Sequence, residues 1–409
     1  MKPVKSLKPK RESLPVLHCR GSYYDVGFSI GKTFRGIIQD SLAENQFYNE
    51  VVLKAGSTPA GKILVQNCLD VCMAKYPNYV SEIRGTADGA QISFDELFML
   101  NMDSILSTID EVRNHNEVSK VGGTGCTTII CNKNDVILGH TEDALAEIKN
   151  HIYIVSAEIV DEEGELLEKF TTLCYPGVLM GYTMGYNSNG MIYSVNTIFP
   201  TVHTSGTPRS FVARALLSTS NLDELVRLLE DEGNGVADGF SINVYFYQKN
   251  GIINGNETST DMDALYNIEV APPLANTFPM KSSVNVMKVG PGQIYEHCNR
   301  FLRISTKEIN QTALKYSDRR SDTIKSHHKP PSNQKDVEEI LSNQTDYNYP
   351  IYNEEKEDNG KYDMSFIKTV AVGKYLLNSY TPCLCISFID IRPLSFCLWI
   401  IWNLPYTDL

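Results

Sequence analysis

The 409-residue chain lacks several features that would each define a class of protein. It has no uninterrupted apolar run of the roughly 20 residues that a membrane-spanning helix needs. It has no excess of basic residues, since 37 Lys and Arg stand against 49 Asp and Glu. The resulting formal net charge of -12 argues against nucleic acid as a partner. Its basic, proline-broken N-terminus lacks the apolar segment of a secretory signal, so we expect a cytoplasmic protein without membrane contact.

The ten cysteines show no regular spacing. In a chain without a secretion signal this pattern favours reduced thiols over a disulfide framework. Cys68 and Cys72 are four positions apart, which is the spacing of one helix face. We therefore expect most of the cysteines to be buried core residues.

What is present is the composition of a globular protein, with 42% hydrophobic and 21% charged residues. Apolar residues at helical spacing predict mainly helix from residue 18 to 120, with one helix following a Thr-Pro start at Thr58. Ser93 and, later in the chain, Asn221 are candidate N-caps. Two hairpins are predicted, one pairing 126–131 with 136–141 and the other pairing 151–160 with 166–174. Residues 181–199 are predicted to form strand, turn and strand, and 239–256 to return to strand. Helices are predicted at 208–220 and 221–233, and the polar, proline-containing stretch 317–334 is predicted to be a loop.

This order of elements predicts an α+β fold in which helices cover both faces of a layered sheet structure. We divide the chain into a disordered lead over 1–17, a helical segment over 18–125 and a strand-rich segment over 126–373. Residues 374–409 form an atypical tail with neither clear strand alternation nor helical periodicity.

The stretch VGGTGCTTII, residues 121–130, places Cys126 between glycines and a β-branched run. A thiol at a strand start is usually a small buried hydrophobe. Here, however, the thiol could attack the carbonyl of Gly125, and hydrolysis of the resulting thioester would leave Cys126 as a new N-terminus. Its α-amine, with an ordinary pKa of about 7.7–8.0, could then act as the base for its own thiol.

Such a nucleophile needs a partner for the amine and donors for an oxyanion. Asp143 follows a return strand of matching length, so we expect it beside Cys126. Asn196 and Asn299 could supply neutral amide donors, although each could equally be a turn or cap residue. The cluster of His140, Glu142 and Asp143 could also be a solvated acidic loop or a metal site, but no second histidine lies at ligand spacing. We expect no metal and no cofactor.

Four segments together resemble the acyl-CoA:6-aminopenicillanate acyltransferase family of N-terminal-nucleophile hydrolases. They are GCTTIICNKNDVILGHTEDA, EIRGTADGAQISFDELFMLN, GYNSNGMIYSVNTI and EHCNRFL, and the resemblance runs from about His18 to Gly373. It implies a four-layer αββα sandwich and cleavage between Gly125 and Cys126 into two fragments that stay together as a heterodimer. It also implies hydrolysis of β-alanyl amides of biogenic amines, such as β-alanyl-dopamine and β-alanyl-histamine (carcinine).

By the matching motifs, Cys126 is nucleophile and base, Asp143 orients the α-amine, and Asn299 and Asn196 stabilise the oxyanion. We add that Glu142 binds the ammonium of the β-alanyl group, because a desolvated cation needs a carboxylate. Two alternatives stay open. One is an acyltransferase that passes the acyl group from Cys126 to an amine, and the other is an unprocessed, inactive homologue that acts by binding.

The sequence departs from the family pattern in two places. An arginine that some relatives carry after the YPI motif is replaced here by Tyr352 and Asn353, and Arg319 or Arg320 is the candidate to take its place. After KTVAVG, residues 368–373, the expected strand is not recognisable. Because Gly-Lys-Tyr can be encoded by a splice-donor sequence, we hypothesise that 374–409 is read-through of an unspliced intron, which would leave one or two strands missing.

Overall fold

The computed structural model describes residues 14–109, 125–201, 206–246, 264–274, 278–308, 311–354, 367–377 and 383–387. Helices and two sheets make up this part of the chain, which confirms the α+β class. No helix among these residues is both long and apolar enough to cross a membrane. Four predicted segments lie wholly outside them: the lead over 1–13, the helical continuation over 110–120, the strand continuation over 247–256 and the tail from 388.

One sheet has eight strands in the order β1-β4-β5-β6-β7-β8-β9-β10. Their bounds are β1 Val16–Gly21, β4 Tyr153–Val160, β5 Leu166–Cys174, β6 Met184–Asn187, β7 Met191–Ile198, β8 Gly239–Phe246, β9 Ala264–Ala271 and β10 Ser283–Val289. All neighbours are antiparallel except β1, which pairs parallel with β4. Because β1 begins at Val16, the lead predicted over 1–17 is too long: its last two residues hydrogen-bond into a sheet.

The second sheet has five antiparallel strands in the order β11-β2-β3-β12-β13. They are β11 Ile294–His297, β2 Gly125–Asn132, β3 Val136–Leu145, β12 Ile367–Leu376 and β13 Cys383–Ser387. The predicted β2–β3 and β4–β5 hairpins are confirmed. The expectation that no strand follows Gly373 is wrong, since β12 continues to Leu376 and β13 pairs with its outer edge. An unpaired edge accepts any extended segment, so this pairing did not need a clear alternating pattern. The intron hypothesis for the tail stays a prediction.

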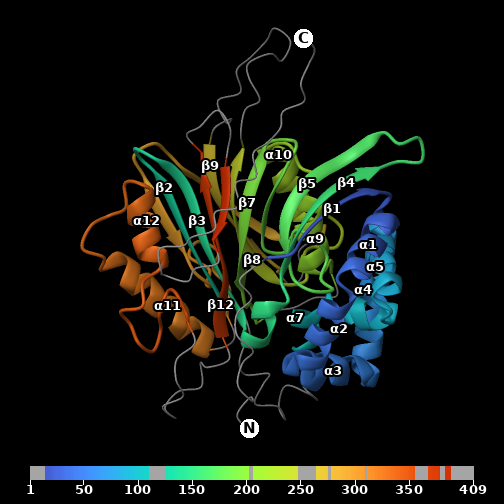
Figure 1. Ribbon diagram of the computed structural model, residues 1–409. Coiled ribbons are helices and arrows are strands. Elements are labelled where there is room, and N and C mark those ends of the chain that lie inside the picture. The colour runs from blue at the N-terminus through green and yellow to red at the C-terminus, as the bar shows by residue number, and fades with distance from the viewer. Residues whose placement is uncertain are drawn as a thin grey trace, which may run out of the picture.

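Helices form the outer layers of the molecule (Figure 1). Their bounds are α1 Tyr23–Thr33, α2 Arg35–Glu44, α3 Leu53–Ser57, α4 Pro59–Lys75, α5 Pro77–Ala90, α6 Phe94–Leu100, α7 Asp103–Leu106, α9 Arg209–Leu216, α10 Leu222–Glu230, α11 Gln311–Lys325 and α12 Gln334–Leu341. The predicted N-caps Ser93 and Asn221 are confirmed, and Ser93 forms a capping box with Glu96. Thr58 of the Thr-Pro start caps α4.

The two sheets face each other, and each carries helices on its other side (Figure 1). Helices α1, α5, α9 and α10 share one apolar core with the outer face of the eight-stranded sheet. On β2, side chains alternate: Ile130 packs between the sheets, whereas Ile129 packs against Val337 and Ile340 of α12. Cys126 has the parity of Ile130, so this alternation directs its thiol into the layer between the sheets.

The loop predicted over 317–334 is wrong over its first half, because α11 extends to Lys325. Its sequence has few apolar residues, which hid the helical period. Tyr316, Arg320 and Ile324 nevertheless recur every four residues, and all three face the interior. This correction matters for the site because it places Arg320 against β2.

Helices α1 and α5 approach so closely that glycine is required where they touch. A Cβ atom on Gly31 would lie 2.1 Å from the carbonyl oxygen of Thr86, and one on Gly27 would lie 2.1 Å from that of Glu82. These neighbours are backbone atoms, which have no rotamer through which to yield. Exposed Gly36, at the start of α2, has no atom within 4 Å of its would-be Cβ.

We expect Gly31→Ala to lower the free energy of unfolding by about 1–3 kcal/mol through overpacking. Gly36→Ala, the matched control, should be neutral or stabilise the protein by up to about 1 kcal/mol, because alanine favours helix. Urea denaturation of both variants measures the difference. Equal stabilities would contradict the close packing of α1 on α5.

Candidate active site

The site is built on the register of the β2–β3 hairpin. Cys126 lies directly opposite Glu142, and Gly125 lies opposite Asp143. Paired residues share one face of a sheet, and adjacent residues point to opposite faces. The thiol therefore has Glu142 beside it, whereas Asp143 lies on the other face, next to the backbone at Gly125. The expected proximity of Asp143 to Cys126 is present in the structure.

The thiol of Cys126 is buried between the sheets with a carboxylate as its neighbour. Its Sγ lies 3.6 Å from Oε2 of Glu142, whose Oε1 accepts a 2.6 Å hydrogen bond from the hydroxyl of Tyr175. Burial raises the pKa of the Cys126 thiol well above its usual value, and the charges of Glu142 and Asp143 raise it further. The thiol is therefore a neutral proton donor in the uncut chain and needs a base to react.

The backbone of Cys126 is held on both sides. Its N–H donates to Oδ1 of Asn299 at 3.0 Å, and its carbonyl accepts from Nη1 of Arg320 at 2.7 Å. Strand β11 explains the first contact: His297 pairs with Thr128, so Asn299, two residues further on, reaches Cys126, two residues earlier in β2. Arg320 also donates to Asn299 Oδ1 and links the two contacts.

Asp143 carries one unsatisfied oxygen. Its Oδ1 accepts from Thr369 at 2.6 Å. Its Oδ2 is buried, has no hydrogen-bond partner among the described residues, and lies 3.6 Å from Nη1 of Arg320. A Cβ atom on Gly125 would lie 3.5 Å from this Oδ2, so the free oxygen faces the backbone just before Cys126. Burial raises the pKa of Asp143 to about 7, although Arg320 and Thr369 act to lower it.

The two predicted oxyanion donors lie in different surroundings. Asn299 contacts Cys126, but its amide nitrogen donates to the carbonyl of Thr197 at 2.8 Å. Asn196 makes no hydrogen bond to Cys126 within the described part of the chain. Its Oδ1 accepts from Thr128 and Asn243, and its Nδ2 donates to the carbonyl of His297. The structure thus brings Asn299 into contact with Cys126, whereas Asn196 is hydrogen-bonded to Thr128, Asn243 and His297.

The inner face of the eight-stranded sheet is polar at the end that faces the site. Asn196, Ser241 and Glu269 are cross-strand neighbours on β7, β8 and β9. The other end of the same face carries Ile192 and belongs to the apolar core between the sheets. A buried polar stripe is costly unless its groups are paired, and these groups form a continuous hydrogen-bonded network.

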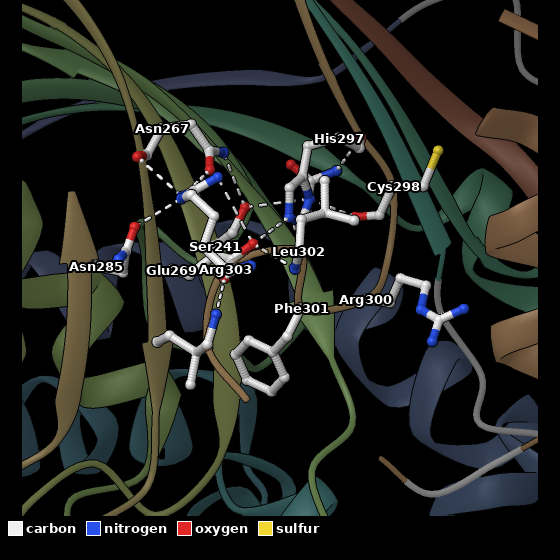
Figure 2. A network of polar contacts seen from close by, with 12 residues as sticks. Ser241, Asn267, Glu269, Asn285, His297, Cys298, Arg300, Phe301, Leu302 and Arg303 are labelled. Atoms are coloured by element: carbon white, nitrogen blue, oxygen red, sulfur yellow. Dashed lines mark hydrogen bonds and ion pairs between the residues drawn. The ribbon is translucent and has the colours of Figure 1, made fainter. Parts of the chain in front are cut away.

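Glu269 anchors the segment that carries Asn299 (Figure 2). Its carboxylate accepts from the backbone N–H groups of Leu302, Arg303 and Ile304 at 2.7–2.9 Å and lies 3.4 Å from His297. Burial alone would raise the pKa of Glu269, but these hydrogen bonds and the charge of Arg303 hold it at about 2. The segment 297–304 is therefore fixed to β9 by one fully buried carboxylate.

The structure changes which residues could bind a metal ion. Asp143 points away from His140 and Glu142, and the ligand atoms that come together are those of Cys126, His140 and Glu142, within 4.8 Å of one another. The cysteines behave as expected: seven of them have described side chains, all seven are free, and six of the seven are buried. Cys131 packs on the opposite face of β2, against α12.

Sequence reasoning placed Cys126, Glu142, Asp143 and Asn299 together but did not locate Arg320, Tyr175 or Thr369. Arg320 was one of two candidates, and its four-residue spacing from Tyr316 was the signal that could have selected it. Tyr175 directly follows the end of β5, and Thr369 on β12 pairs with Asp143 on β3. No sequence pattern marks either residue, because each reaches the site only through the order in which distant strands pair.

Comparison with known proteins agrees with this geometry. A family model described as acyl-coenzyme A:6-aminopenicillanic acid acyl-transferase matches residues 130–387. The chain belongs to this family, as its motifs predicted, and the match continues past Gly373 to the end of β13. The chain is also 37% identical, over 380 residues, to a Drosophila melanogaster protein named beta-alanyl-dopamine/carcinine hydrolase. That alignment covers 91% of this chain and 92% of the relative.

We expect Glu269→Gln to destabilise the protein by about 3 kcal/mol near neutral pH, because an amide leaves buried N–H groups without acceptors. The folded-state pKa of about 2 lies below the ordinary value of 4.5, so the contribution of Glu269 is full above pH 4.5 and is lost as the pH falls towards 2. Denaturation measured from pH 7 to pH 3 should show the gap between wild type and variant narrowing on acidification. A gap independent of pH would contradict the assigned role.

Proposed function

We propose that the protein is a self-processing N-terminal-nucleophile cysteine amidohydrolase that cleaves β-alanyl amides of biogenic amines. The observation that carries the proposal is the environment of the Gly125–Cys126 bond. The nitrogen and carbonyl of Cys126 are both held, and the carboxylate oxygen that faces them, Oδ2 of Asp143, has no hydrogen-bond partner in the described part of the chain. The name of the Drosophila relative supports the substrate class. The layering of two sheets between helices supports the αββα sandwich that this mechanism accompanies.

Processing begins with attack of Sγ of Cys126 on the carbonyl carbon of Gly125. A C–S bond forms, the C–N bond breaks, and the thiol proton ends on the released α-amine of Cys126. Water then hydrolyses the thioester, which leaves a carboxylate on Gly125 and restores the thiol. Glycine at 125 leaves room for the attack, and the contacts from Asn299 and Arg320 hold the backbone while the bond is exchanged.

The freed α-amine gains hydrogens that need acceptors. Asn299 Oδ1 already accepts one, and Asp143 Oδ2 is the buried acceptor available for another. An ammonium beside Asp143 would favour its ionised form and so lower its raised pKa. We therefore assign Asp143 to orienting the amine, which as a neutral base takes the proton of the Cys126 thiol during catalysis.

Amide hydrolysis repeats the same chemistry on a substrate. Sγ attacks the acyl carbonyl, the amine leaves with the proton held by the α-amine, and water cleaves the β-alanyl thioester. We assign oxyanion stabilisation to the Asn299 amide, whose N–H would turn from the carbonyl of Thr197 to the oxyanion in the transition state. Asn196 is the second candidate donor. Glu142, buried 3.6 Å from Sγ, is the carboxylate in reach of the substrate ammonium.

Transfer of the acyl group to an amine instead of water is the second candidate, and the acyl-transferase in the family description is the observation that supports it. Both reactions share the acyl-enzyme and differ only in the acceptor. Product analysis with and without an added amine separates them. An uncut, inactive homologue that acts by binding is the remaining alternative, and the cytoplasmic location also stays a prediction.

We expect purified protein to consist of a 125-residue fragment and a 284-residue fragment that begins Cys-Thr-Thr. Cys126→Ala should leave the chain intact and lower amide hydrolysis by roughly 10³-fold or more, because nucleophile and base are both lost. Denaturing electrophoresis with N-terminal sequencing measures the cut, and a β-alanyl amide assay measures turnover.

Cys131→Ala and Cys298→Ala are the matched controls, since both thiols are buried near the site but lie outside the catalytic set. Both should process and turn over like wild type. Complete cleavage in Cys126→Ala would contradict the mechanism.

We expect Glu142→Gln to lower kcat/KM for a β-alanyl amide about 10²-fold more than for the propionyl amide of the same amine. The two substrates differ only in the ammonium group, so the ratio of their losses in kcat/KM reports whether Glu142 binds that group. Steady-state kinetics on both substrates gives the comparison. Equal losses would mean that Glu142 does not bind the cationic end.

A further inference from the structure

Cys126, His140 and Glu142 share the inner face of the β2–β3 hairpin and are nearly inaccessible, at 1%, 0% and 3% exposure. Glu142 Oε2 lies 3.1 Å from Nε2 of His140 and 3.6 Å from Sγ of Cys126. Three ligand atoms of different chemistry thus converge on one point. The mechanism above uses two of these side chains and leaves His140 without a role.

The hydrogen bonds of Thr128 fix which nitrogen of His140 carries a proton. Asn196 Nδ2 donates to the carbonyl of His297, which makes Asn196 Oδ1 an acceptor, and Thr128 spends its one hydroxyl hydrogen on that oxygen at 2.8 Å. Thr128 Oγ1 therefore accepts from Nδ1 of His140, also at 2.8 Å. In neutral His140 the lone pair of Nε2 then faces the carboxylate of Glu142.

Facing lone pairs in a buried site require a cation between them. A proton can serve, and so can a metal ion. Tetrahedral zinc has bonds of about 2.3 Å to sulfur and about 2.0–2.2 Å to nitrogen and oxygen, which places its ligand atoms roughly 3.2–3.7 Å apart. The 3.6 Å spacing of Cys126 and Glu142 lies within that range, and the 3.1 Å spacing of His140 and Glu142 lies just below it. All three ligand atoms lie within 4.8 Å of one another, so a small shift would close them around an ion. A histidine ligand whose other nitrogen donates to a neighbouring oxygen is the usual arrangement in metal sites.

We propose that Cys126, His140 and Glu142 form a reversible inhibitory site for a soft divalent cation of the zinc type. Binding exchanges the thiol proton for the metal: the S–H bond breaks, the proton leaves to solvent, and the thiolate sulfur becomes a ligand. The bound cation occupies both the nucleophile and the carboxylate assigned to the substrate ammonium. Mg²⁺ and Ca²⁺, which prefer oxygen ligands, should not compete.

Inhibition rests on the proposed role of Cys126, but cation binding does not, so the two are measured separately. Binding is followed with Cd²⁺, whose thiolate complex has an ultraviolet charge-transfer band, on chelator-treated full-length protein. Inhibition is followed by titrating Zn²⁺ into the β-alanyl amide assay. Glu142→Gln accompanies His140→Gln as a second ligand variant, and circular dichroism confirms that each is folded.

We expect wild type and the control Cys131→Ala to show the band and Cys126→Ser to lack it. His140→Gln and Glu142→Gln should each weaken Cd²⁺ binding by roughly 10²-fold, with a parallel rise in the Zn²⁺ inhibition constant wherever activity remains. A full band in Cys126→Ser, or wild-type affinity in both ligand variants, would overturn the site. An uncut or inactive chain that still binds Cd²⁺ through these residues would overturn the proposed function and leave the cation site standing.

Discussion

The antiparallel pairing of β2 with β3 places a carboxylate on each side of Cys126. Because the side-chain period of a strand is two, Glu142 lies with the thiol in the layer between the sheets, and Asp143 lies with the backbone on the side of α11. A shift of one residue in this register would exchange the two surroundings. The hairpin register therefore gives the two acids different surroundings, and the proposed mechanism uses Asp143 at the amine and Glu142 in the acyl pocket.

The rest of the molecule stabilises this hairpin and neutralises its charges. Arg320, fully buried on α11, lies against Asp143 and holds the carbonyl of Cys126, and the pKa of this arginine is raised beyond its usual value despite the opposing effect of burial. On the other side, Glu269 fixes segment 297–304, which carries Asn299 (Figure 2). Each buried charge in the site thus has partners from a different strand or helix, which requires the complete fold.

Local sequence was sufficient wherever the determining interactions are local. Alternation and turn residues close in sequence predict the β2–β3 hairpin, the caps at Ser93 and Asn221, and the position of Asp143 beside β2. Local sequence was not sufficient where packing between distant segments determines the structure. Helix α11 is stabilised by three inward residues in a polar sequence, and β13 by an edge that no local pattern reveals. The position of Arg320 depends on that helix and was left open for the same reason.

Trapping the acyl-enzyme tests the central claim most directly. Rapid acid quenching during turnover of a β-alanyl amide, followed by mass spectrometry of the separated fragments, locates the acyl group. The account predicts one added β-alanyl group on the fragment that starts at Cys126, attached to that residue and absent from the 125-residue fragment. A β-alanyl group on another residue, or on an active chain still joined at Gly125–Cys126, would contradict it.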